Sequence, residues 1–270
     1  MNSTLQPALW WRPAPMKTER SFFDVTRAAK TVARCVACPH ALQNWPQQAR
    51  CTPGDACIRA DSGRQIDRFL RKNSQEAESY LQDSFWERRA IACRYAPLAA
   101  IFSLMHDADE VVRRVVASRL PLENLPDMAH DPDREVRHTV ALRLPPEKLV
   151  LLLGDPDYLV RVTVAKRLPH GQLLRLARDP EREVRKAVAA RLPSFALSML
   201  RNDAEEEIRA LVASRALPEL AAQFLADPEW WVRFSALAHA PAEHLLPLLD
   251  DPEAEIRAEA RRLLEHAESS

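Results

Sequence analysis

The chain has 270 residues, of which 47% are hydrophobic and 28% charged, a balance that excludes an intrinsically disordered protein. The longest aliphatic run, residues 149–153, is far too short to span a bilayer, and residues 1–15 lack the apolar core of a signal peptide. We therefore expect a cytoplasmic protein without membrane contact. In that reducing compartment its five cysteines are expected to act as ligands or thiols and not as disulfides.

The formal net charge is zero, but it is unevenly distributed. Residues 1–82 carry 12 basic and 7 acidic side chains, a net charge of +5, so the remainder carries −5. This distribution argues against nucleic acid as a partner, because nucleic-acid binding normally needs a strongly basic face.

Four cysteines lie close together near the N-terminus, with the spacing Cys35-x2-Cys38, twelve residues, and Cys51-x5-Cys57. Four thiolates are the right number for tetrahedral Zn²⁺ or for an iron–sulfur cluster, and the spacing leaves both open. We predict a metal site on these four residues. His40 is an alternative ligand, although with four cysteines present a surface position or a hydrogen bond to a ligand is the expected role.

From residue 83 onward, an Asp followed six residues later by an Arg recurs every 24 residues without an insertion. The eight pairs are Asp83/Arg89, Asp107/Arg113, Asp131/Arg137, Asp155/Arg161, Asp179/Arg185, Asp203/Arg209, Asp227/Arg233 and Asp251/Arg257. Such a period is typical of a solenoid, in which each unit buries its apolar side against its neighbours. We expect two regions: residues 1–82, a cysteine-bearing cap, and residues 83–270, eight repeats with a degenerate first and a capping last copy.

Residues 131–154 represent one repeat. The pattern predicts a helix with Asp131 as N-cap and the following proline in the first turn, carrying an apolar stripe at Val136, Val140 and Leu144. Two prolines end the helix, and only about eight residues remain before the next Asp. A leucine spacing of three in so short a segment favours a 3₁₀ helix over a strand.

One position in each repeat is nearly always small: Cys93, Ala117, Ala141, Ala165, Ala189 and Ala213. Small side chains there would let successive helices pack closely. We therefore interpret Cys93 as the small residue of the first repeat and not as a fifth metal ligand.

The arginines form two rows. The first belongs to the Asp/Arg pairs, and we interpret it as a structural tie between adjacent repeats, with phosphate binding as the rival interpretation. A second row follows at Arg119, Arg143, Arg167, Arg191 and Arg215, for which a structural role and an acidic or phosphate-bearing partner are both open.

Large apolar residues replace the usual polar pair in the first turn of two helices, at Tyr158 and Leu159 and at Trp230 and Trp231. They either pack under a neighbouring loop or contact a protein partner, because aromatic residues dominate interface hot spots.

The repeat Asp-Pro-x-x-x-Val-Arg-x-x-Val-Ala-x-Arg-Leu-Pro-x-x-x-Leu-x-x-Leu resembles the leucine-rich repeat variant, and the cysteine spacing resembles that of its iron–sulfur members from nitrogen-fixing bacteria. The resemblance implies an all-α, right-handed superhelical solenoid of alternating α and 3₁₀ helices. It also implies a 4Fe–4S cluster on Cys35, Cys38, Cys51 and Cys57, with Zn²⁺ as the alternative cofactor.

No Gly-rich phosphate loop, nucleophile elbow or His-rich metal motif occurs in the sequence, so we expect no enzyme activity. The leading hypothesis is an iron–sulfur-binding scaffold for a protein partner, with a redox-responsive cap. An electron-transfer protein is the second hypothesis, and nucleic-acid binding or repair is the third.

Overall fold

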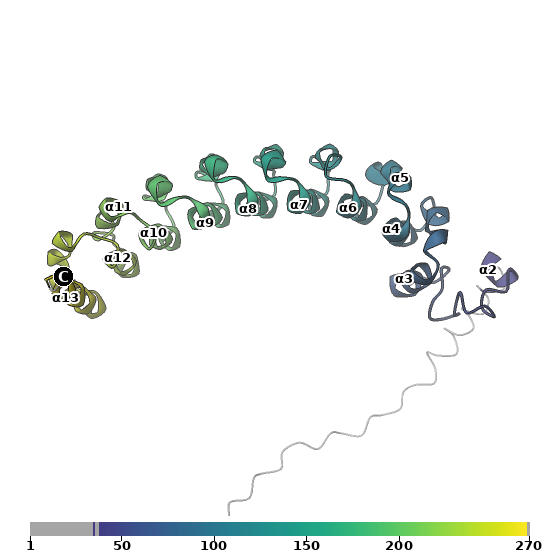
Figure 1. Ribbon diagram of the computed structural model, residues 1–270, viewed down its shortest axis with the longest axis horizontal. Coiled ribbons are helices and arrows are strands. Elements are labelled where there is room, and N and C mark those ends of the chain that lie inside the picture. The colour runs from purple at the N-terminus through teal and green to yellow at the C-terminus, as the bar shows by residue number, and fades with distance from the viewer. Residues whose placement is uncertain (1–34, 36–37, 269–270) are drawn as a thin grey trace, which may run out of the picture. The chain divides into compact units, whose positions relative to one another are not determined.

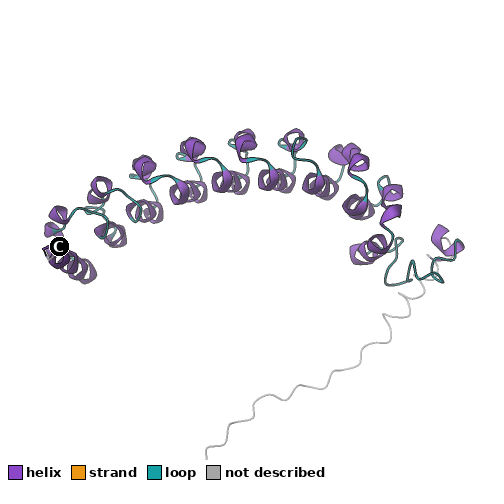
Figure 2. Cartoon of the chain, in the orientation of Figure 1, coloured by secondary structure: helices purple, strands orange, loops and turns teal. Residues whose placement is uncertain are grey.

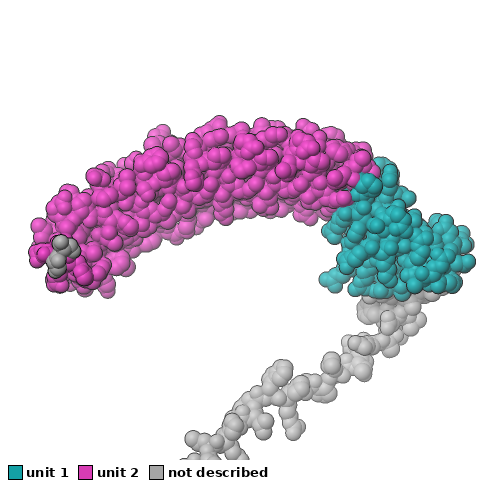
Figure 3. All heavy atoms as spheres, in the orientation of Figure 1, with its two compact units in different colours: residues 1–97 teal, residues 98–270 magenta. Residues whose placement is uncertain are grey.

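The computed structural model describes residues 35 and 38–268. The chain divides into two compact units, residues 1–97 and 98–270 (Figure 3). The division falls later than the expected start of the repeats at residue 83. The reason is that helix α4, which the first repeat supplies, packs against the preceding helices of unit 1.

Unit 1 contains four helical segments among its described residues. They are α2 (Pro39–Leu42), α3 (Gly63–Lys72), the 3₁₀ helix η1 (Ser74–Tyr80) and α4 (Trp86–Tyr95). Helices α3, η1 and α4 pack on one another, whereas residues 43–62 form turns between α2 and α3.

Unit 2 alternates the two helix types along the chain (Figures 1 and 2). The α-helices are α5 (Leu98–Ile101), α6 (Glu110–Arg119), α7 (Arg134–Arg143), α8 (Tyr158–Arg167), α9 (Arg182–Arg191), α10 (Glu206–Ala213), α11 (Pro218–Ala222), α12 (Trp230–Leu237) and α13 (Ala254–Glu268). The 3₁₀ helices are η2 (Phe102–His106), η3 (Leu125–Met128), η4 (Pro146–Leu152), η5 (His170–Leu176), η6 (Ser194–Leu200), η7 (Ala242–His244) and η8 (Leu246–Asp250).

Within unit 2 the long α-helices stand side by side in one layer and the 3₁₀ helices form the other (Figure 1). The described residues contain no strand, since Thr52 and Ala56 form only an isolated antiparallel bridge. The expectation of an all-α solenoid of alternating α and 3₁₀ helices is confirmed. The second half of most repeats forms a 3₁₀ helix, as predicted, and not a strand. None of the described helices has the length and apolarity needed to cross a membrane.

The helices begin two residues later than the sequence indicated. Asp133, and not Asp131, is the N-cap of α7, and its carboxylate accepts hydrogen bonds from the N–H groups of Glu135 and Val136 at 2.9 and 3.1 Å. Asp131 instead closes the turn before the helix by accepting the N–H of Asp133 at 2.9 Å. The prediction that the Asp of each pair is the N-cap was wrong, because the Asp131 carboxylate already accepts two hydrogen bonds from Arg113 of the preceding repeat.

Prolines determine where the second segment of a repeat begins. Pro145, Pro169 and Pro193 each precede a 3₁₀ helix directly, because the proline ring fixes an extended entry. In the sixth repeat the proline is shifted by one, so that Pro218 is the first residue of a helical turn. That segment, α11, is an α-helix and not a 3₁₀ helix.

The core of unit 2 lies between the two layers. Val136 and Val140 of α7 and its C-cap Leu144 are fully buried, as are Leu149 and its equivalents in the 3₁₀ layer. The small position is also buried, and Ala117, Ala141, Ala165 and Ala189 are each 0% exposed. Adjacent helices contact each other along the array, so the expectation of close helix packing at the small position is confirmed.

Candidate functional site

The four predicted ligand cysteines are brought together in unit 1. Cys35, Cys38, Cys51 and Cys57 all line one pocket of about 330 Å³, a volume that includes its opening to solvent. Cys38 is buried and the other three are half-buried, and no disulfide links any of the five cysteines. Cys93 is buried within α4 and is not among the residues that line this pocket, in agreement with its interpretation as a small core residue.

The first pair is held by a turn at the start of α2. The N–H of Cys38 donates to the carbonyl of Cys35 at 3.1 Å, and Cys38 is the N-cap of the helix that Pro39 begins. Because proline at the first helical position has no N–H to satisfy, the chain enters the helix directly after the second thiol. This arrangement turns both side chains of the Cys-x2-Cys pair toward the same region.

The second pair is held by a short closed loop. The N–H and C=O groups of Thr52 and Ala56 exchange two hydrogen bonds of 2.9 Å, and Gly54 between them has a positive φ of 82°. A glycine adopts this conformation without steric cost, which explains why the loop can close. The N–H of Cys57 donates to the carbonyl of Gln65 in α3 at 3.1 Å and so anchors the loop to that helix.

A polar network fixes the residues that precede Cys51. The Arg50 guanidinium lies 3.6 Å from the centre of the Trp45 ring and donates from Nε to Asn73 at 3.2 Å. Asn73, which is buried, returns a hydrogen bond of 2.8 Å to the Arg50 carbonyl and bonds the carbonyl of Phe69 at 2.9 Å. The position of Cys51 is therefore determined by side chains that lie more than twenty residues away in the sequence.

The pocket is electrostatically unfavourable for thiolates alone. Burial raises the pKa of Cys35, and the neighbouring Cys57 and Cys38 raise it further by charge repulsion. The pKa of Cys51 is raised for the same reasons, although the positive charge of Lys72 opposes the effect. A bound cation would remove this repulsion, so the donor set suits a metal group with thiolate affinity.

These residues fit the expected cofactor in type and number. Thiolates are the preferred ligands of zinc and of iron–sulfur clusters, and four of them share one pocket. The thiols surround the pocket without being gathered at one point: within residues 35 and 38–268, no three His, Cys, Asp or Glu side chains are grouped tightly enough to hold a metal ion.

Of the two roles expected for His40, a surface residue or a hydrogen-bond donor to a ligand, the first is wrong. It is 8% exposed, lines the cysteine pocket, and packs its ring 3.9 Å from that of Trp45 and 5.3 Å from that of Phe69. Burial lowers the pKa of His40, an effect that outweighs the opposing influence of Glu76 and Gln43. No spacing rule could have found this position, because the aromatic residues that bury His40 come from three separate segments.

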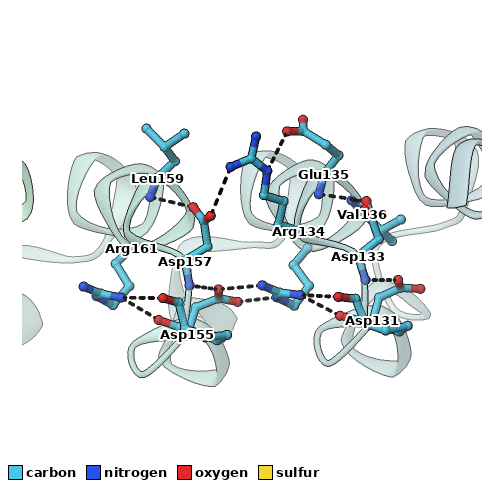
Figure 4. A network of polar contacts seen from close by, with 12 residues as sticks. Asp131, Asp133, Arg134, Glu135, Val136, Asp155, Asp157, Leu159 and Arg161 are labelled. Carbon is cyan, nitrogen blue, oxygen red and sulfur yellow. Dashed lines mark hydrogen bonds and ion pairs between the residues drawn. The ribbon is translucent and has the colours of Figure 1, made fainter.

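The first arginine row forms a continuous ladder in unit 2. Six arginines, Arg113, Arg137, Arg161, Arg185, Arg209 and Arg233, each pair bidentately with the Asp of the next repeat, through Nε–Oδ2 contacts of 2.7–2.8 Å and Nη2–Oδ1 contacts of 2.9–3.1 Å. The Nη1 group of Arg161 also donates to the carbonyls of Asp155 and Pro156 in its own repeat (Figure 4). Four donors of each guanidinium are thus used inside the protein, and the interpretation of this row as a structural tie is confirmed.

The second arginine row also has a structural role. Nη1 of Arg143 donates to the carbonyl of Ala117 at 2.6 Å, and Nη1 of Arg191 donates to the carbonyls of Ala165 and Leu168 at 2.7 Å each. These carbonyls lie at the end of the preceding α-helix, where no intrahelical donor remains. Because the helices run parallel, their dipoles align, and a positive charge at each C-terminus stabilises the array.

The four predicted partner-contact residues lie on the surface of the α-helical layer. Tyr158, Leu159 and Trp230 are 39%, 44% and 45% exposed, whereas Trp231 is half-buried. Phe234, which the sequence reasoning missed, is 42% exposed and lies one turn after Trp230 on α12. The signal that could have found it is the four-residue spacing between these two aromatic residues.

The part of the chain that contains Trp230 and Phe234 is rich in acidic residues. Residues 203–268 contain 15 acidic and 6 basic side chains, a net charge of −9, whereas residues 98–202 carry 14 acidic and 17 basic side chains. The neighbouring helices α10 and α13 present alanines, Ala210 and Ala258, at the position equivalent to Phe234. The Phe234 ring therefore has small residues at the equivalent position of both neighbouring helices, in a part of the chain with a net negative charge.

The chain was compared with known proteins. The family model described as leucine rich repeat variant matches residues 134–157, 158–181 and 182–205. A solved structure described as a leucine-rich repeat variant with a novel repetitive protein structural motif is 50% identical, with a TM-score of 0.78, and the match covers 84% of this chain and 97% of that one. An engineered protein of solved structure aligns over 88% of this chain and 93% of its own chain at 15% identity. Its TM-score of 0.39 is too low to support a shared fold. A search of curated proteins finds no match. The chain belongs to the leucine-rich repeat variant family.

Proposed function

We propose that this protein is a cytoplasmic, non-enzymatic scaffold that binds a protein partner through its repeats and carries a 4Fe–4S cluster in its N-terminal unit. Repeat solenoids offer extended surfaces to partners, and both arginine rows of this one serve the fold. The contact surface is therefore to be sought among exposed side chains that the fold does not use.

The observation that carries the scaffold function is the exposure of Trp230 and Phe234 on one face of α12. Two large rings that leave more than two fifths of their surface in water are costly unless a partner covers them. The net charge of −9 in this part of the chain favours a partner whose apolar contact residues are flanked by Lys or Arg. Tyr158 and Leu159 form a second, smaller contact on α8.

The cluster is supported by the pocket that Cys35, Cys38, Cys51 and Cys57 share. These four thiolates would hold the cluster, one at each iron, and with all corners filled by cysteine no iron would remain open to a substrate. The cluster would supply one-electron redox chemistry, and its loss on oxidation would loosen the two loops that the thiols tie together.

The scaffold is tested by quantitative cross-linking of anaerobic cell extract to the full-length chain, comparing Trp230→Ala with Phe195→Ala. Phe195 is 78% exposed in the 3₁₀ layer and serves as the matched control. We expect cross-links on α12 to be lost in the first variant and kept in the second, with unchanged melting temperatures. Equal capture by both variants would refute α12 as the contact surface.

The cluster is tested by measuring iron, acid-labile sulfide and zinc in anaerobically purified protein. We expect about four irons and four sulfides per chain, and a loss of both in Cys35→Ser. Cys93→Ala is the matched control, because alanine occupies the same position in five other repeats. One zinc per chain without sulfide would establish the alternative cofactor. Partner capture by Cys35→Ser as strong as by the native chain would exclude a redox-responsive interaction.

Electron transfer is the second candidate function. It is favoured by the partial exposure of Cys35, Cys51 and Cys57, which would leave the cluster close to the protein surface. Reversible reduction without cluster loss, at a rate that depends on ionic strength, would support it. Nucleic-acid binding has less support, since the ladder arginines that would have bound phosphates donate to carboxylates and carbonyls of the chain itself.

A further inference from the structure

The imidazole of His40 is held rigidly beside the cysteine pocket. His40 is the second residue of α2 and lies two positions after Cys38. Its ring is packed on Trp45, with an interplanar angle of 30°, and against Phe69. Tyr80 at the end of η1 contacts its far side through a hydrogen bond of 2.5 Å to Nε2. The ring therefore has a single orientation determined by three aromatic neighbours.

The second ring nitrogen of His40 has no hydrogen-bond partner among the described residues. Nδ1 of His40 is buried and makes no hydrogen bond within the part of the chain that the structure describes. Gln43 approaches the imidazole from the next turn, but it does not meet hydrogen-bond geometry at Nδ1. A buried polar group without a hydrogen-bond partner destabilises the folded state. Because His40 lines the cysteine pocket, a group bound there would be a suitable partner for Nδ1.

One tautomer of His40 gives its contact with Tyr80 a donor and an acceptor and also leaves a proton on Nδ1. In that tautomer the Tyr80 hydroxyl, whose hydrogen-bond partner among the described residues is Nε2 of His40, donates its proton to Nε2. Nε2 is then the acceptor, and the ring proton lies on Nδ1. The opposite tautomer would direct a nitrogen lone pair at a pocket lined by four thiolates, which is electrostatically unfavourable.

We propose that His40 is a positioning residue of the cluster, and that its Nδ1–H donates a hydrogen bond to a cluster sulfur. This inference rests on the proposed 4Fe–4S cluster and adds a residue that tunes it. A donor to sulfur stabilises the reduced form, which carries more negative charge, and so raises the reduction potential. Tyr80 would act indirectly, because its hydroxyl bonds Nε2 of His40 and so sets the tautomer and the orientation of the imidazole.

The inference is tested on the full-length, cluster-loaded chain. His40→Phe keeps an aromatic ring against Trp45 and removes the donor, whereas His40→Asn retains an amide donor near the former Nδ1. We expect the reduction potential of the Phe variant to shift to a more negative value at unchanged iron content, and the Asn variant to recover part of the shift. Leu42→Ala, at a position of the same helix that is 79% exposed, is the matched control and is expected to leave the potential unchanged.

A second measurement needs no variant. In reduced protein labelled with ¹⁵N-histidine, pulsed electron paramagnetic resonance is expected to detect a hyperfine coupling from one histidine nitrogen. An unshifted potential in loaded His40→Phe, or the absence of such a coupling in the native chain, would overturn the role of His40 while leaving the cluster in place. Zinc in place of iron in the native chain would overturn both proposals.

Discussion

The ladder between repeats gives the sharpest test of how the array is held together, and Arg137→Met is the most informative change. The side chains of Arg137 and Asp155 are only 9% and 2% exposed. Arg137 makes two bonds to that carboxylate and two to the carbonyls of Asp131 and Pro132 at 2.8 and 3.1 Å. Methionine preserves the apolar stem but leaves the buried carboxylate without its counter-charge.

The expected loss is large because the remaining group stays buried. Removing one partner of a buried ion pair destabilises a protein by about 3–5 kcal/mol. Asp155 would keep only the N–H of Asp157 at 2.9 Å as a donor. Because each repeat contacts only its neighbours, the loss acts at a single interface of the array, which is enough to separate the flanking repeats under mild denaturant.

The measurement is urea unfolding of the full-length chain followed by far-ultraviolet circular dichroism. Asp155→Asn and the double variant complete a thermodynamic cycle, and we expect a coupling free energy of about 1.5–3 kcal/mol. Arg262→Met provides the matched control, since Arg262 pairs with Glu259 on the exposed surface of α13 and its removal is expected to have no measurable effect. A loss for Arg137→Met no larger than that for Arg262→Met would refute the structural role of the ladder.

Three further predictions concern the repeats. Arg191→Met removes two hydrogen bonds from the C-terminal carbonyls of the preceding repeat, so we expect the unfolding free energy to fall by about 1–2 kcal/mol in urea titrations. Ala141→Leu overfills a position that is 0% exposed, which should lower the unfolding free energy by about 1–3 kcal/mol, whereas Leu142→Ala at 53% exposure should have little effect. The third prediction concerns the loss of stability at low pH, to which Asp251 contributes. Burial alone would raise the pKa of Asp251, but hydrogen bonds from Arg233 and from the N–H of Glu253 hold it below its usual value. The stability that this carboxylate contributes is therefore fully present above the unfolded value of about 3.9 and lost as the pH falls through the lower folded pKa. The difference in unfolding free energy between the native chain and Asp251→Asn should shrink below about pH 4, and a difference that stays constant would contradict it.

The repeat pattern was readable from the sequence because it is enforced locally. Each 24-residue copy contains its own turn, helix and stop signals, and Val136, Val140 and Leu144 lie on one face by spacing alone. The small position at Ala141 and the pairing of Arg137 with a neighbouring Asp followed from repetition, since an identical environment recurs at each step. Even within this pattern, the N-cap was placed two residues too early, because the sequence does not say that Asp131 is already occupied by Arg113 of the preceding repeat.

The sequence by itself therefore determined the solenoid, the alternation of helix types and the four candidate cysteine ligands. The tertiary structure decided what each conspicuous side chain contacts. Arg191 caps the preceding helix, Phe234 joins Trp230 on an exposed face, and the ring of His40 is enclosed by Trp45, Phe69 and Tyr80. The physical reason is the range of the forces involved: helix caps and apolar stripes act within a few residues. Burial, counter-charges and hydrogen-bond partners depend on segments that only folding brings together.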